Sequence, residues 1–235
     1  MNDFEKVLAL GLGSHIANTA GFVIDDLAAA GVMPSDGPQT SAQAAIVLLG
    51  VMGLPAPGDT VAVVDYWRHA MLSGASTIKT TGNFRVHESY WHDVETMEEM
   101  RQASPALFQP LLDLLTGAIE CHRSAEQVDT IGDHKVLAFS LDHKTNRAQL
   151  DINLHASYEG GALVSRHEYT VSPDYQTLVD SDQWPPAQLQ QFGASVSVAA
   201  AGSIFFDIAD YLNNHAQAAA GLPVTKRIAA ERRAH

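Results

Sequence analysis

The sequence predicts an α+β fold, with helices in the first part of the chain and an antiparallel β-meander with covering helices after it. Two changes of apolar spacing predict this class. Through the first 72 residues, apolar side chains recur every three or four positions, as on one face of a helix, and from His134 they recur at every second position, as in strands. Helical spacing then returns over residues 203–220.

The predicted domains follow these changes. We expect a helix-turn-helix-like helical domain over 1–72, an α+β domain over 84–225 and a basic tail over 226–235. Residues 73–83 are small and polar, and such a composition is typical of a linker or loop.

Caps and apolar stripes place the helices around this division. Asn2 and Glu5 have the spacing of a capping box at the start of a short helix with an apolar stripe. An apolar helix over 41–52 is expected to be buried, because its apolar stretch of about 16 residues is shorter than the ~20 of a membrane span. Asp59 is predicted to cap a helix whose stripe ends at Met71.

Further elements are predicted in the second half from the same two periodicities. We expect helices over 94–102, from Pro105 through Ile119 and over 203–220. We expect strands over 136–142, around 149–154, over 163–171 and around 196–198.

The segment HIANTAGFVIDDLAAAG has the shape of a helix-turn-helix. Ile16 and Ala17 fit a first helix, Gly21 fits the turn, and Leu27 fits the anchor of a second helix that ends near Gly31. An αα-hairpin used only for packing or protein contact would show the same pattern.

The second helix is poorly suited to reading bases. Its predicted exposed positions carry no Arg, Lys, Asn or Gln, the side chains that best contact base edges. These positions are Val23, Ile24, Asp25, Asp26, Ala28 and Ala29. Residues 1–72 hold two basic side chains against seven acidic ones, so DNA contact would depend on other groups.

Two groups of residues are the candidates for such contact. The candidates are Ser14, His15, Asn18 and Thr19 beside the first helix, and Lys226, Arg227, Arg232 and Arg233 in the tail. The tail has a net charge of +3 in a chain of −13, and it could instead be an ordinary solvated terminus.

Composition excludes several other functions. A single Cys121 excludes an intramolecular disulfide framework and a cysteine-based zinc site. The acidic balance disfavours broad nucleic-acid binding. Acids stand where a signal peptide would have basic residues, so a cytoplasmic protein without a membrane span is expected.

Eleven histidines leave an enzymatic alternative open. His87, His92 and Asp93 could form a histidine–carboxylate hydrolase site, although HExxH spacing is absent. His155 and His167 could be cross-strand neighbours that form a composite site with Glu168. Otherwise the sequence predicts no metal site, no cofactor and no catalytic motif.

The chain also resembles a group of uncharacterised proteins from proteobacterial genomes and prophages. The resemblance covers the first 70 residues or so and residues 194–213. It is carried by Ala30, Gly31, Val32, Met33, Pro34, Ala44, Ala45, Leu48 and Leu49, and by the segment SVSVAAAGSIFFDIADYL.

The resemblance implies a phage-type accessory protein. We therefore expect a non-catalytic DNA-associated regulator or packaging-type adaptor that contacts itself or a protein partner. A protein-interaction module that binds no nucleic acid and a small hydrolase are the alternatives.

Overall fold

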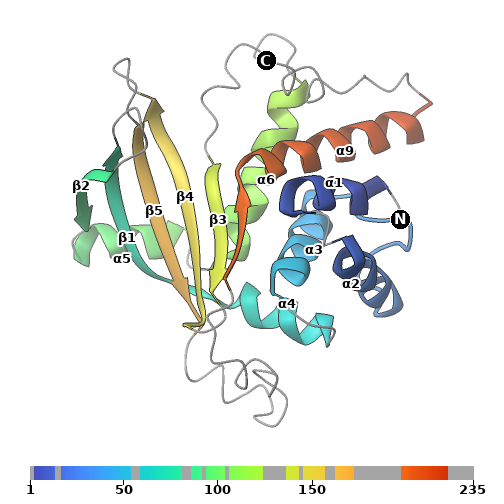
Figure 1. Ribbon diagram of the computed structural model, residues 1–235, viewed down its shortest axis with the longest axis horizontal. Coiled ribbons are helices and arrows are strands. Elements are labelled where there is room, and N and C mark those ends of the chain that lie inside the picture. The colour runs from blue at the N-terminus through green and yellow to red at the C-terminus, as the bar shows by residue number, and fades with distance from the viewer. Residues whose placement is uncertain are drawn as a thin grey trace.

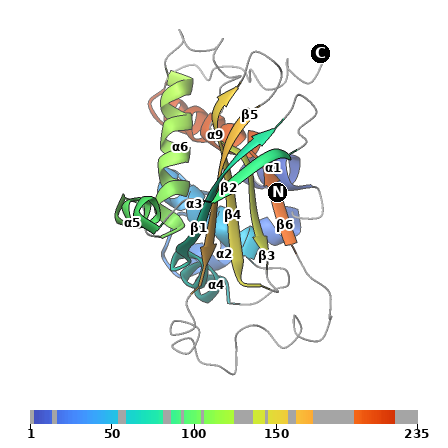
Figure 2. The same cartoon turned by 90° about the vertical axis from the view of Figure 1, so that its left-hand side faces the viewer.

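The computed structural model is an α+β protein whose helices pack against a six-stranded antiparallel sheet (Figures 1 and 2). The predicted fold class is thereby confirmed. The structure describes residues 3–13, 17–53, 59–80, 86–91, 94–103, 106–123, 136–142, 145–156, 162–171 and 197–221.

Four helices form the N-terminal part. They are α1 (Asp3–Leu12), α2 (Ala17–Ala29), α3 (Ser41–Gly53) and α4 (Thr60–Arg68). Asp59 caps α4 as predicted, because its carboxylate accepts the Ala62 N–H at 3.0 Å.

Gly31 ends α2 as predicted. It has a φ of 73°, and the N–H groups of Gly31 and Val32 donate to the carbonyls of Ala28 and Leu27. This pair of hydrogen bonds forms a Schellman motif, in which a glycine adopts the left-handed conformation at low steric cost.

The predicted turn at Gly21 is wrong. One continuous helix runs from Ala17 to Ala29, and Gly21 lies in its interior. A glycine inside a helix costs only about 1 kcal/mol relative to alanine, which tertiary packing readily offsets. Here α2 packs against α1, α3 and α4.

The remaining elements form the sheet and its cover. The strands are β1 (Met71–Thr80), β2 (Val86–Trp91), β3 (Val136–Asp142), β4 (Arg147–Ala156), β5 (Ala162–Thr170) and β6 (Ser197–Ala201), and the helices are α5 (Val94–Ala103), α6 (Phe108–Arg123) and α9 (Ser203–Ala219).

The strand order is β2-β1-β5-β4-β3-β6. The meander of β3, β4 and β5 is confirmed, and the predicted fourth strand exists as β6 beside β3. The predicted linker over 73–83 is wrong, because its residues up to Thr80 lie in β1, between β5 and β2. Met71 likewise begins this strand instead of closing the stripe of α4.

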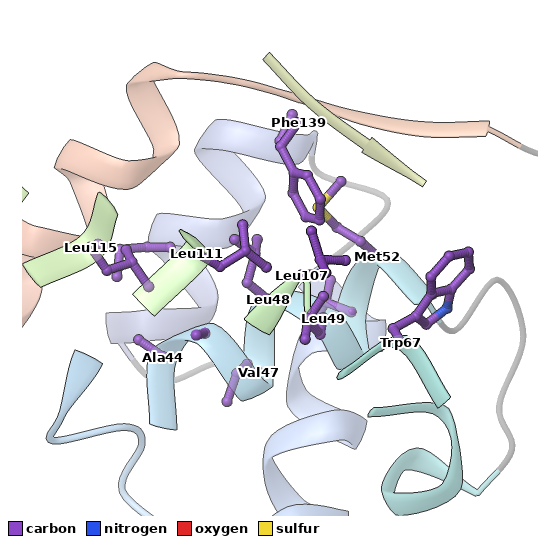
Figure 3. Close-up of a cluster of buried hydrophobic side chains, with 14 of the residues drawn as sticks. Ala44, Val47, Leu48, Leu49, Met52, Trp67, Leu107, Leu111, Leu115 and Phe139 are labelled. Atoms are coloured by element: carbon purple, nitrogen blue, oxygen red, sulfur yellow. The ribbon is translucent and has the colours of Figure 1, made fainter. Parts of the chain in front are cut away.

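One cluster of buried apolar side chains joins the helices to the sheet. Phe139 of β3 points into a group that contains Leu48 and Met52 of α3, Leu111 of α6 and Trp67 of α4 (Figure 3). The division after residue 72 stays a prediction, and side chains from both sides of it meet in this cluster.

The last helix packs on the first. α9 contacts α1 and α6, and its side chains Ile204, Phe205 and Ile208 are buried as the sequence predicts. Phe4 of α1 contacts the ring of Tyr211 of α9, with centroids 4.9 Å apart.

Candidate functional site

The predicted DNA-contact residues are described only in part. Ser14 and His15 lie outside the described residues, as do Lys226, Arg227, Arg232 and Arg233. Asn18 lies in α2, and Thr19 is half-buried in the same helix. The structure therefore brings none of the described candidates together into a basic surface.

The surface of α2 differs from the predicted recognition helix. Val23 and Ile24 were expected to be exposed, but they are buried with Leu27 in the core. Asp25 is exposed as predicted, and Phe22, which was not among the predicted positions, is 39% exposed.

Asp26 has a structural partner. Its carboxylate accepts the Thr60 N–H at 3.2 Å, which joins α2 to the first turn of α4. A carboxylate at a helix N-terminus is stabilised by the orphan N–H groups there. Asp26 therefore holds two helices together and leaves Asp25 as the exposed acid of the pair.

Both basic side chains of the first 72 residues have local partners. Lys6 donates to Asp3 at 2.7 Å, and the guanidinium of Arg68 lies 4.6 Å from the ring centroid of Phe108. The helical surface thus offers no cluster of cations among the described residues, whereas phosphate binding needs several.

The predicted composite histidine site is wrong. His155 pairs with Leu163 in the register, whereas His167 pairs with Leu150, so the two histidines are not cross-strand neighbours. Glu168 follows His167 in the strand and so lies on the other face of the sheet.

The predicted hydrolase site stays a prediction. The backbone of His87 lies in β2, and His92 and Asp93 lie outside the described residues. Within the described part of the chain, no group of three or more His, Cys, Asp or Glu side chains could hold a metal ion.

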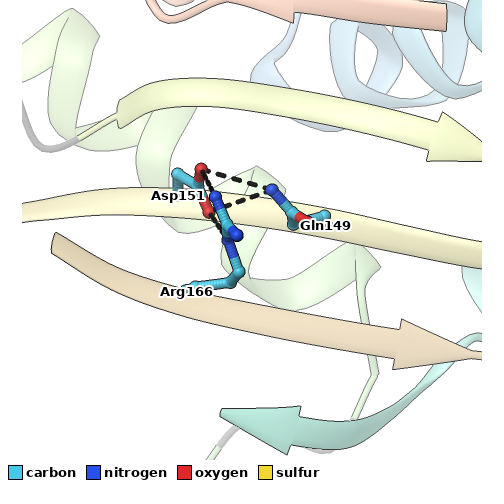
Figure 4. Close-up of polar contacts among 3 residues, drawn as sticks. All are labelled: Gln149, Asp151 and Arg166. Carbon is cyan, nitrogen blue, oxygen red and sulfur yellow. Dashed lines mark hydrogen bonds and ion pairs between the residues drawn. The ribbon is translucent and has the colours of Figure 1, made fainter. Parts of the chain in front are cut away.

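An ion pair occupies the face of the sheet opposite Phe139. Both nitrogens of the Arg166 fork, Nε and Nη2, donate to Asp151 at 2.8 Å, and Gln149 donates to the same carboxylate (Figure 4). Hydrogen bonding to Asp151 is the main reason that the pKa of Arg166 is raised. The ion pair joins β4 to β5. Because Asp151 and Arg166 already neutralise each other, neither is available to bind a charged ligand.

A second polar pair lies on the helix-facing side of β5. Ser165 Oγ lies 2.9 Å from His167 Nε2, a hydrogen-bond distance, and the ring of His167 lies 6.5 Å from that of Tyr169. Burial raises the pKa of Tyr169 well above its ordinary value. The motif-based reading of the sequence missed this pair, although the spacing of two residues within a predicted strand places both side chains on one face.

Comparisons of the chain with protein-family models, curated proteins and solved structures find no match. None of the helices in the described residues is both long enough and apolar enough to span a membrane. The proposed function therefore depends on the fold and on the exposed side chains of α2.

Proposed function

We propose that the protein is a non-catalytic adaptor that acts through protein contacts made by its helical part, in the cytoplasm. The observation that carries the proposal is the surface of α2. This helix buries its apolar side and presents an exposed aromatic ring, Phe22, beside an acid, Asp25. Aromatic side chains are enriched in protein interfaces, whereas exposed acids repel phosphate.

A packaging-type adaptor or regulator of phage origin fits this proposal. The resemblance to prophage-associated proteins supports it. We commit to a second copy of this chain as the first partner to test, because self-association needs no unidentified protein.

Sedimentation velocity over a range of concentrations tests the proposal. The wild-type chain should self-associate, and Phe22→Ser should weaken the association at least several-fold. Met71→Ser is the matched control, because Met71 is also exposed, at 44%, but lies at the start of β1. A chain that stays monomeric, or equal weakening by both variants, would contradict the proposed role of α2.

DNA association is the second candidate, favoured by the four basic residues of the tail. Fluorescence anisotropy with a labelled duplex should show binding that falls steeply between about 50 and about 200 mM salt. Replacing Lys226, Arg227, Arg232 and Arg233 with Gln should abolish it. Tight binding that survives this change would overturn the proposal that the helical part contacts protein and not DNA.

A further inference from the structure

The exposed face of α2 continues onto the first turn of α4. Asp26 of α2 accepts the Thr60 N–H, so the two helices meet at this hydrogen bond. Phe22 lies one helical turn before Asp26, and Val61 follows Thr60 directly. Phe22 and Val61 are 39% and 42% exposed, and they are two of the four large apolar side chains that are exposed in the described part of the chain. The α2–α4 surface is defined here as Phe22, Asp25, Asp26, Asp59 and Val61.

The α2–α4 surface carries negative charge without a matching cation. Asp26 and Asp59 accept backbone N–H groups of α4, which are uncharged, and Asp25 is exposed. None of the three carboxylates forms an ion pair with a described residue. The N-terminus of α4 offsets them by only about half a positive charge. The surface therefore combines exposed apolar side chains with a net negative charge.

The basic tail over 226–235 has the complementary composition. Two basic pairs, 226–227 and 232–233, flank the short segment IAAE, and the tail has a net charge of +3. The cations match the carboxylates of the α2–α4 surface, and Ile228 offers an apolar side chain to Phe22 and Val61. Opposite charges on two surfaces steer their encounter and select the partner, and apolar side chains add contact area.

The position of α9 favours a contact between two copies of the chain. The described residues end at Gly221, two residues after α9, and residues 222–235 follow. Figures 1 and 2 both place α9 and α4 at opposite ends of the helical layer. The tail would reach the α2–α4 surface of its own molecule only by running back along this layer, whereas a second copy can bring this surface to the tail.

We propose that the basic tail of one copy binds the α2–α4 surface of a second copy. The inference rests on the proposed self-association and deepens it, because it names the segment that α2 contacts. Such a contact is heterologous, since each copy offers its tail to one neighbour and its α2–α4 surface to another. Assembly then proceeds head to tail, as rings or open chains, instead of stopping at a symmetric dimer.

Sedimentation velocity of full-length variants tests the tail and the surface separately. Replacing the four basic residues of the tail with Gln should weaken self-association about tenfold or more, and raising salt from about 50 to about 500 mM should also weaken it, because salt screens exposed charges. Asp25→Lys should weaken it about fivefold or more, because it replaces an attraction with a repulsion. Glu99→Lys makes the same change of charge at an exposed position of α5, so it is the matched control and should leave association unchanged.

Mixing the two variants tests whether the contact joins different copies. The Asp25→Lys chain keeps its basic tail, and the chain with the Gln-substituted tail keeps its α2–α4 surface. An equimolar mixture therefore restores one heterologous contact but cannot extend further. The mixture should form a complex of one chain of each kind, with about the affinity of a single wild-type contact, although each variant alone stays largely monomeric.

Several results would overturn the proposal. If the chain with the Gln-substituted tail associates as the wild type does, α2 contacts another segment, and the proposed function stands without this inference. A mixture that stays monomeric would assign the tail to its own copy or to DNA. Equal weakening by Asp25→Lys and Glu99→Lys, or association that salt leaves unchanged, would refute charge complementarity. A wild-type chain that is monomeric at every concentration would instead refute the proposed self-association, and this inference with it.

Discussion

Replacing Gly21 with alanine distinguishes a continuous α2 from a helix-turn-helix. In the continuous helix, the nearest atoms to a Cβ at Gly21 would be those of the Glu5 carboxylate, at 3.5 Å, which is ordinary contact. Alanine gains helix propensity over glycine without a clash. Gly21→Ala should therefore stabilise the protein by about 0.5–1 kcal/mol and raise Tm by about 1–4 °C.

Two other glycines act as controls for this measurement. A Cβ at Gly50 would lie 2.9 Å from Val23 Cγ1, so Gly50→Ala should destabilise the protein by about 1–3 kcal/mol through overpacking. Gly31 has a φ of 73°, and Gly31→Ala should cost about 1 kcal/mol because alanine is strained there.

Urea unfolding followed by circular dichroism, together with thermal scans, measures all three changes. If Gly21 were the turn of a helix-turn-helix, it would need the conformation that Gly31 has. A Gly21→Ala variant that loses stability as Gly31→Ala does would refute the continuous helix and restore the two-helix interpretation.

Three further predictions concern a cap, an ion pair and a buried phenol. Asp59→Ala should lower the free energy of unfolding by about 1 kcal/mol, whereas Asp59→Ser should retain most of it; equal losses in urea titrations would rule out the cap. A double-mutant cycle with Arg166→Ala and Asp151→Ala should give a coupling energy of about 1 kcal/mol that falls with salt, and additive effects would contradict the forked pair. Because burial raises the pKa of Tyr169, the unfolded chain loses this proton first above pH ~10, and stability should fall by up to about 1.4 kcal/mol per pH unit. Tyr169→Phe should make that fall shallower in urea titrations at about pH 9 and about pH 11, and an unchanged slope would exclude Tyr169 as its source.

Elements with a long, regular apolar pattern could be predicted from the sequence. The strand β3 has the predicted bounds, Val136–Asp142, and α9 begins at Ser203 as predicted. In both, the regularly spaced apolar side chains are buried, such as Phe139 and Leu141 in β3 and Ile204 and Ile208 in α9. Local periodicity is then sufficient, because it records which face meets the core.

The hairpin of β1 and β2 could not be predicted in the same way. The sequence SGASTIKT in β1 is rich in small polar residues, whose intrinsic strand preference is weak or context-dependent. Pairing with β5, far along the chain, makes this segment a strand. That information lies in the partner strand and is absent from the segment itself.

The polar pairs show a similar limit. Asp151 and Arg166 are 15 residues apart, and only the register of β4 and β5 places them side by side. Ser165 and His167 share a face by their spacing alone, yet the sequence does not say that this face meets the helices. The alternation of side chains along β5 can be recognised in the sequence, but only the fold shows which of its two faces meets the helices.

The packing of α9 on α1 has a consequence for the order of synthesis. α1 ends at Leu12 and α9 begins at Ser203, so at 5–20 residues per second roughly 10–40 s pass before the last helix follows the first from the ribosome. Through that interval the apolar side of α1, including Phe4, lacks the helix that covers it in the native protein. The nascent chain therefore exposes an apolar surface, to which chaperones can bind and which proteases can recognise, until α9 has been synthesised.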